Sequence, residues 1–332
     1  MTFAIQRFAV RCATVAAAGL ALAALQGPAI AADAFPTHPV KLMVPYPPGG
    51  GTDVLARIVA PKLAEALKQS VVIENRGGAG GTIGTAAVAQ AAPDGYTILI
   101  ANTLPHTSAA GLYSSLPYDP VKNFAAVGMI ASVPYMLAVN PKVPAQSVKE
   151  FIGLARSAPA KINYASAGNG SATHLAAELF KTATKVDITH VAYKGGGPAL
   201  NDLLAGQVQA TFENVAALVP HVKAGTLRGL VITGPQRTPL FPDLPTMSES
   251  GYPGFDVSGK FGFIVPAGTP KDVIATLNKA LNQALAQPEL VKQLGAQGAQ
   301  ATATTSKEFD DLIKAESDKW LKVLRDAKIK ND

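Results

Sequence analysis

The chain of 332 residues contains one cysteine, Cys12. A disulfide framework, a cysteine enzyme and a thiolate metal site are therefore excluded for the residues that follow it. Charged residues make up only 16% of the chain and are scattered rather than clustered, so we expect no nucleic-acid partner. No apolar run reaches the ~18 residues that a membrane-spanning helix needs, so we also expect no direct membrane insertion.

The signatures of the common catalytic and cofactor sites are missing as well. The five histidines form neither an HExxH motif nor a pair four residues apart, so we expect no metal. No G-x-S-x-G elbow and no G-x-x-x-x-G-K-[ST] phosphate loop occurs. The glycine run at 77–84 resembles a dinucleotide loop, but Ile83 stands where the third glycine belongs. We therefore expect a tight packed turn there, and no cofactor.

The N-terminus has the pattern of a secretory signal peptide. Arg7 and Arg11 precede the apolar run 12–25, and small residues follow at 29–31. This pattern predicts a signal peptide over residues 1–32 that is cleaved near Ala31 or Ala32, and hence an exported protein.

Strand patterns alternate with helix patterns over the rest of the chain. The first set starts with a strand at 40–44 and a helix at 52–68, which we expect Pro61 to kink. A second set starts with a strand at 135–139, and a proline- and glycine-rich connection covers 233–259. The alternation predicts an α/β fold in which helices cover both faces of a parallel sheet. Crossovers near 132–135 and 256–260 predict two lobes, one of residues 33–133 with 259–332 and the other of residues 134–258.

The most informative segment is the loop 46–53, which joins a strand to a helix. Its three successive glycines leave backbone N–H groups open to a small anion, and the helix adds its positive end. This loop predicts a carboxylate site without a cationic side chain. A tight turn with no ligand is the alternative.

A second loop of the same type lies at 164–174, again between a strand and a helix. Ser166, Asn169 and Ser171 offer side-chain partners, and Gly168 and Gly170 expose backbone donors. The alternative is that Ser171 or Thr173 only caps the helix. Two such loops, one in each lobe, are the arrangement expected of a receptor that closes on its ligand.

Five more polar residues follow predicted strands. Asn102 and Thr103 end a strand of the first lobe, and Lys194 lies in a glycine turn, where it either neutralises a second ligand carboxylate or faces solvent. Glu213 and Asn214 either accept a hydrogen bond from a ligand or cap the next helix. A secreted serine hydrolase that uses Ser171 or Ser166 with His174 is the alternative function.

Several long stretches resemble the Bug-type receptors of tripartite tricarboxylate transporters. They include VPYPPGGGTDVLAR at 44–57, VVIENRGGAGGTIGTAAVAQAAPDGYT at 71–97, LPYDPVKNFAAV at 116–127, YASAGNGSATHLAAELFK at 164–181, HVAYKGGGPALNDLLAGQVQATF at 190–212 and PAGTP at 266–270. The resemblance covers essentially the whole chain after the signal peptide. It implies a two-lobed periplasmic-binding-protein (Venus-flytrap) fold, type II-like, with mixed or parallel sheets flanked by helices.

The resemblance also implies a function. It implies a periplasmic protein that closes on a small mono-, di- or tricarboxylate and delivers it to membrane permease subunits, without catalysis or cofactor. A ligand sensor for a signalling system is a further alternative. The expected ligand-binding residues are Tyr46, Pro48, Gly49, Gly50, Asp53, Asn102, Thr103, Ser166, Gly168, Asn169, Gly170, Ser171, His174, Lys194 and Glu213.

Overall fold

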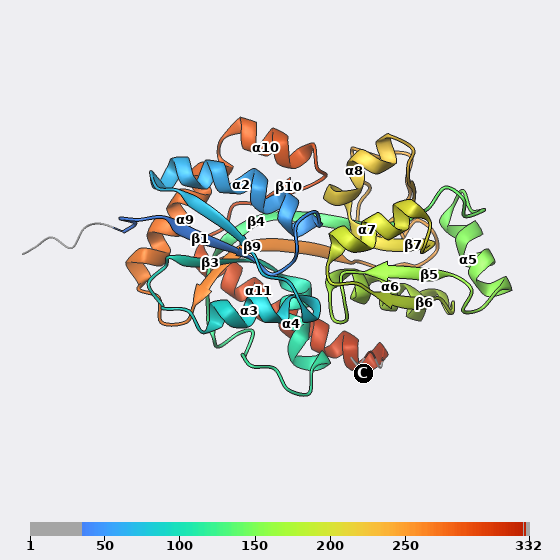
Figure 1. Cartoon of the computed structure of the whole chain (residues 1–332), viewed down its shortest axis with the longest axis horizontal. Helices are drawn as coiled ribbons and strands as arrows, with labels where there is room; N and C mark the ends of the chain where they lie inside the picture. Colours follow the sequence, from blue (N-terminus) through green and yellow to red (C-terminus); the bar gives the residue numbers. More distant parts are fainter. Residues whose placement is uncertain (1–34, 328, 330–332) are drawn as a thin grey trace, which may run out of the picture. The chain divides into compact units, whose positions relative to one another are not determined.

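The computed structural model describes residues 35–327 and 329, so the predicted signal peptide lies outside the described residues. From His38 onward the chain forms one compact unit (Figure 1). Within the described part of the chain, no helix has both the length and the apolar character to cross a membrane.

Ten strands form a mixed sheet. Eight of them lie in the order β2-β1-β3-β9-β4-β7-β5-β6, while β8 and β10 each pair with β4. The strands are β1 (Val40–Val44), β2 (Val71–Asn75), β3 (Thr97–Asn102), β4 (Phe124–Val139), β5 (Asn163–Ser166), β6 (Thr189–Ala192), β7 (Ala210–Asn214), β8 (Arg228–Ile232), β9 (Ser258–Pro266) and β10 (Gln300–Ala301). Pairs β1–β2, β1–β3, β5–β6 and β5–β7 are parallel. Pairs that involve β4 or β9 are antiparallel, so the expectation of a parallel sheet is wrong for these two strands.

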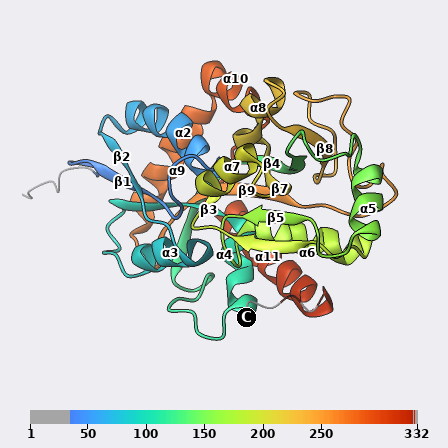
Figure 2. The same cartoon turned by 45° about the vertical axis from the view of Figure 1, so that its right-hand side comes forward.

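Helices lie on both sides of this sheet. In Figures 1 and 2, α2, α8 and α10 lie on one side, and α3, α4, α6 and α11 lie on the other. The helices are α2 (Gly51–Leu67), η1 (Ala79–Gly81), α3 (Thr82–Ala89), α4 (Thr103–Leu112), α5 (Val148–Ser157), α6 (Ala172–Thr184), α7 (Gly196–Ala205), α8 (Val215–Lys223), α9 (Lys271–Leu285), α10 (Pro288–Gly295) and α11 (Ser306–Ala327). The two-lobed α/β fold is confirmed, whereas the sequence patterns did not predict α4 and α10. The predicted helix at 52–68 is observed as α2, which continues past Pro61.

Strand β4 joins the two lobes because it is long enough to pair in both. Its residues from Phe124 to Pro134 pair with β9, and those from Tyr135 to Val139 pair with β7. We call the part built on β1, β2, β3, β9 and β10 the first lobe, and the part built on β5 to β8 the second lobe. The chain crosses between them near Pro134 and again at Ser258.

In each lobe buried apolar side chains form a cluster, and that of the second lobe extends into α4 and α11. In the first lobe, Leu99, Ile264 and Phe309 are fully buried, and in the second, Phe180 and Phe212 are. Because these clusters fix the strands, they also fix where each strand ends. Strands β1, β3, β5, β6 and β7 each lead within a few residues into a helix, and such carboxyl ends of parallel strands are where α/β folds bind ligands.

Candidate functional site

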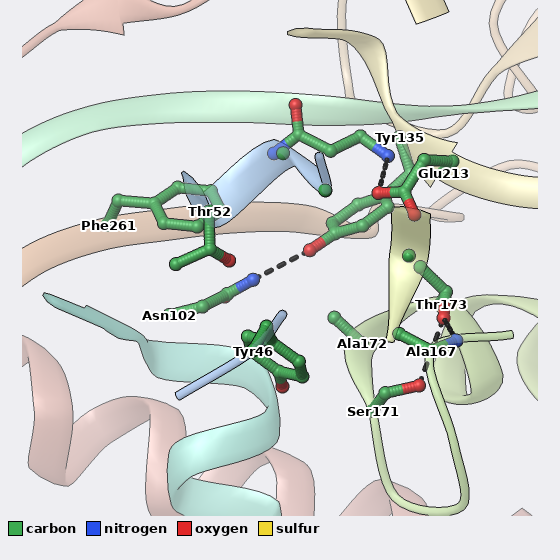
Figure 3. A pocket seen from close by; sticks show the side chains of 14 residues that line it. Tyr46, Thr52, Asn102, Tyr135, Ala167, Ser171, Ala172, Thr173, Glu213 and Phe261 are labelled. Carbon is green, nitrogen blue, oxygen red and sulfur yellow. Dashed lines mark hydrogen bonds between the residues drawn. The ribbon is translucent and has the colours of Figure 1, made fainter. Parts of the chain in front are cut away.

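A cavity lies where the two lobes meet, and both contribute to its wall. Counting its open mouth, it has a volume of about 360 Å³. Its lining residues are Tyr46, Gly50, Gly51, Thr52, Asn102, Tyr135, Ala167, Ser171, Ala172, Thr173, Gly196, Glu213, Asn214 and Phe261. Figure 3 shows Thr52, Asn102 and Phe261 of the first lobe on one side and Ser171, Ala172 and Thr173 of the second lobe opposite them.

Five helices begin at this cavity. The lining includes the N-terminal or N-cap residues of α2 (Gly50 to Thr52), α4 (Asn102), α6 (Ser171 to Thr173), α7 (Gly196) and α8 (Asn214). The first N–H groups of a helix have no partner within the helix, and its N-terminus carries a partial positive charge. Five such ends around one small space make a site for an anion.

Side chains add hydrogen-bond donors to these backbone groups. Asn214 is 2% exposed, and its Nδ2 has no hydrogen-bond partner among the described residues. Its Oδ1 accepts the N–H of Ala216 at 2.8 Å, so the same side chain caps α8. The Tyr135 hydroxyl accepts from Asn102 Nδ2 at 2.6 Å, which leaves the phenol hydrogen for another acceptor (Figure 3). An amide donor and a phenol donor are thus held at the cavity wall.

No side-chain cation supplements these donors. Of the described residues that line the cavity, none is lysine, arginine or histidine. Lys194 is exposed and lies outside the lining. Within the described chain, no three His, Cys, Asp or Glu side chains gather as a metal site would require. The donors that this lining can offer to an anion are therefore main-chain N–H groups and neutral side chains.

In the first predicted loop, Tyr46 and Gly50 line the cavity, while Pro48, Gly49 and Asp53 do not. Asp53 is almost fully buried and accepts hydrogen bonds from Gly49 N (3.0 Å), Arg57 Nε (2.8 Å) and Asn75 Nδ2 (2.9 Å). These partners hold the pKa of Asp53 below its usual value, although burial opposes them. Asp53 therefore shapes the loop, and the Gly49 N–H is already occupied by it.

In the second predicted loop, Ser171 lines the cavity, whereas Ser166, Gly168, Asn169, Gly170 and His174 lie outside the lining. Ser166 is fully buried; its Oγ accepts from Gly168 N at 3.1 Å and lies 2.6 Å from His190 Nε2. The Nδ1 of His174 accepts from Gly170 N at 3.2 Å. These contacts stabilise the conformation of the loop that leads into α6.

The serine–histidine pairs of the hydrolase alternative lack the required geometry. Ser171 Oγ bonds to Thr173 Oγ1 at 2.9 Å and accepts the backbone N–H of His174, so it caps α6. The imidazole of His174 contacts Gly170, not Ser171. Ser166, the other serine of that alternative, lies 2.6 Å from the Nε2 of His190, a histidine that the alternative did not include, and is outside the cavity. Neither pair presents an activated nucleophile to the cavity.

Glu213 is the one acidic side chain of the lining. It is 6% exposed, and its Oε1 accepts the N–H of Asn214 at 2.7 Å. Burial raises the pKa of this carboxyl to about 7, against the lowering effect of that hydrogen bond. Thr103, at the first turn of α4, is buried outside the lining, and its Oγ1 has no hydrogen-bond partner among the described residues.

Sequence reasoning missed seven of the lining residues. They are Gly51, Thr52, Tyr135, Ala167, Ala172, Gly196 and Phe261. The sequence pointed to Thr173 and Asn214 without placing them among the expected ligand-binding residues. Most of the missed residues directly follow or precede a predicted site residue. The sequence signal that could have revealed them is a strand end followed by a helix start. Tyr135 and Phe261 had no such signal, because they lie on the crossover strands β4 and β9.

The two lobes touch across the mouth of the cavity. A Cβ added to Gly50 would lie 3.5 Å from Gly196 Cα, and one added to Gly80 would lie 2.2 Å from the carbonyl oxygen of Asn169. The Tyr113 hydroxyl of the first lobe donates to that same oxygen at 2.7 Å. The two lobes are thus in direct contact in this structure.

Comparison with known proteins places this geometry in a family. Residues 55–329 match the family described as the tripartite tricarboxylate transporter family receptor. Protein BugT of Bordetella pertussis is 40% identical over 314 residues, which cover 94% of this chain and 96% of BugT. The structure of R. palustris Rpa4515 with adipate has a TM-score of 0.86 and 38% identity, and covers 89% of this chain and 99% of that one. MatC from Rhodopseudomonas palustris with bound malate has a TM-score of 0.84 and 35% identity, and the match covers 87% of this chain and 100% of MatC.

Proposed function

We propose that this chain, which belongs to the tripartite tricarboxylate transporter receptor family, captures one small organic carboxylate between its lobes and delivers it to membrane permease subunits. The family consists of periplasmic solute-binding proteins, so the chain is not an enzyme.

The observation that carries the proposal is the convergence of five helix N-termini on a cavity without a side-chain cation. A carboxylate has about four acceptor sites on its two oxygens. The open N–H groups of α2 and α6 and the Nδ2 of Asn214 can satisfy these sites. Desolvation of the anion is then offset by oriented dipoles, as it is at other helix N-termini.

The receptor has two states, an open form and a closed form. Donors from α2 and α4 belong to the first lobe, and those from α6, α7 and α8 belong to the second. A ligand that bonds to both sets stabilises the closed form relative to the open form. The permease then distinguishes the loaded receptor by its shape rather than by its ligand.

The compounds named for two related structures support the ligand class. Adipate and malate are both small carboxylates. We propose that the chain is exported by a cleaved signal peptide, in keeping with its N-terminal sequence.

Calorimetric titration tests the proposal. We expect one-to-one binding of at least one compound from a panel of linear and aromatic mono-, di- and tricarboxylates. The amide that corresponds to the best ligand is the control, and it should bind at least about tenfold more weakly because it lacks the charge that the helix ends favour. Failure of every carboxylate to bind would contradict the proposal.

A further inference from the structure

Glu213 has an unusual place for an acid in a carboxylate receptor. It ends β7 and lines the cavity with only 6% of its surface exposed. Its Oε1 accepts from Asn214 N, and Oε2 accepts no hydrogen bond from any described residue. Oε2 is directed to the start of α7, since a Cβ added to Gly196 would lie 2.8 Å from it. The carboxyl therefore has one satisfied oxygen and one open oxygen at the binding cavity.

A bound carboxylate and an ionised Glu213 would compete for the same positive helix ends. The cavity holds no lysine, arginine or histidine among its described lining residues to balance a second negative charge. Two carboxyl groups that share a small, dry site cannot both ionise without a large cost, and one of them keeps a proton. The open oxygen of Glu213 is the place for that proton.

We infer that ligand binding at this site is coupled to protonation of Glu213, whose carboxyl then donates a hydrogen bond from Oε2 to the bound carboxylate. This inference rests on the proposed function. The proton comes from solvent, and no other bond forms or breaks. Glu213 is thereby a ligand-binding residue that acts as an acid, and it makes the affinity of the receptor depend on pH.

The electrostatic surroundings of Glu213 agree with this assignment. Burial already raises its pKa to about 7 without a second anion in the cavity. The titratable groups that interact with it are the phenols of Tyr46, from the β1–α2 loop, and Tyr135, from β4, and the pKa of each is raised by burial and by Glu213. Both phenols stay neutral through the physiological range. Tyr135 can donate to an anion, whereas Tyr46 already donates to the carbonyl oxygen of Gly80 at 2.8 Å. Neither phenol can balance the charge of an anion.

The inference has a measurable thermodynamic consequence. Above pH 7, free Glu213 is mostly ionised, so each binding event takes up nearly one proton. The binding constant then falls about tenfold for each pH unit above 7 and is flat well below 7. Burial lowers the pKa of the nearby histidines His174 and His190, so neither titrates above pH 7.

The test is calorimetry of malate and adipate binding at pH 6 and pH 8.5 in two buffers of different ionisation enthalpy. For the wild-type protein we expect uptake of close to one proton per ligand at pH 8.5 and close to none at pH 6. This measurement needs no variant. Binding at pH 8.5 with the same enthalpy in both buffers would overturn the inference while it leaves the proposed function standing.

Two variants assign the proton to its residue. In Glu213→Gln we expect no proton uptake and an affinity that does not change from pH 6 to pH 8.5, because the amide donates without titrating. Glu249→Gln removes the same charge from an exposed residue of the second lobe, which pairs with Arg237, and should keep the wild-type pH profile. Full proton uptake in Glu213→Gln would overturn the inference. If malate, adipate and every other carboxylate fail to bind at both pH values, the proposed function fails, and this inference fails with it.

Discussion

The hydroxyl of Tyr113 lies 2.7 Å from the carbonyl oxygen of Asn169 and donates to it across the mouth of the cavity. The same hydroxyl is 2.9 Å from the carbonyl oxygen of Ala79 in its own lobe. Because Asn169 belongs to the second lobe, its bond to Tyr113 exists only while the lobes are closed.

Replacing Tyr113 with phenylalanine should therefore weaken ligand binding without changing the site itself. A hydrogen bond of this kind is worth about 0.5–1.5 kcal/mol, so we expect the affinity to fall about two- to tenfold, mainly through faster dissociation. Stopped-flow kinetics measures this rate. Tyr193→Phe is the matched control, because its hydroxyl donates to Asp202 within the second lobe, and it should leave the dissociation rate unchanged. Equal rates in Tyr113→Phe and the wild type would contradict the role in closure.

Gly80 tests closure by steric contact. A Cβ there would lie 2.2 Å from the Asn169 carbonyl oxygen, and the residue has a φ of +64°. We expect Gly80→Ala to reduce affinity more than tenfold and to keep the liganded protein open in small-angle scattering. Gly225→Ala has the same backbone penalty, with a φ of +70°, but its Cβ would meet nothing within 4 Å. If both variants close on ligand equally well, the contact does not govern closure.

Asn214 tests the unpaired donor. Asn214→Asp and Asn214→Ser both keep an oxygen that can cap α8, but both lose the Nδ2 donor. We expect each to bind carboxylate at least about tenfold more weakly, and the aspartate variant to be the weaker of the two because it adds a negative charge. Calorimetry gives the affinities, and thermal unfolding verifies the fold. Wild-type affinity in the serine variant would show that this amide does not contact the ligand.

The buried carboxyl of Glu213 should also make stability depend on pH. Its pKa rises from 4.5 to about 7 on folding, so between these values the folded state binds more protons than the unfolded state. The contribution of Glu213 is therefore most favourable below pH 4.5 and is lost as the pH rises through 7, a change of roughly 3 kcal/mol. The free energies of unfolding of the wild type and of Glu213→Gln can be measured with denaturant at pH 4.5 and at pH 8. Between these two pH values the wild type should lose this amount of stability relative to the variant. A constant difference would mean that burial does not raise the pKa of this carboxyl.

Local patterns predicted most of the helices and strands of this protein. Residues 305–308 have the pattern of a capping box, and α11 starts there, where the Glu308 carboxylate accepts from Thr305 N at 2.7 Å. Helix α4 escaped prediction because Pro105 and a mostly buried surface hide its helical period. The length of β4 was not predicted either, because a single apolar strand contributes to the sheet of both lobes.

The sequence predicted part of the cavity. The two glycine loops indicated two helix starts, whereas five helices begin there. The contributions of α7 and α8 depend on the pairing of β5 with β6 and β7, which is not a local property. The glycines in the sequence indicated accessible backbone N–H groups. Only the structure shows that the Gly49 N–H donates to the Asp53 carboxylate. Which donors remain open for a ligand is decided by such contacts.

The central claim is that helix N-termini from both lobes, rather than cations, hold the ligand. The most direct measurement is a crystal structure of the protein purified with its natural ligand. The account predicts a carboxylate within hydrogen-bond distance of the first N–H groups of α2 and α6 and of Asn214 Nδ2. A ligand bound through Lys194 outside the cavity, or a cationic molecule within it, would contradict the account.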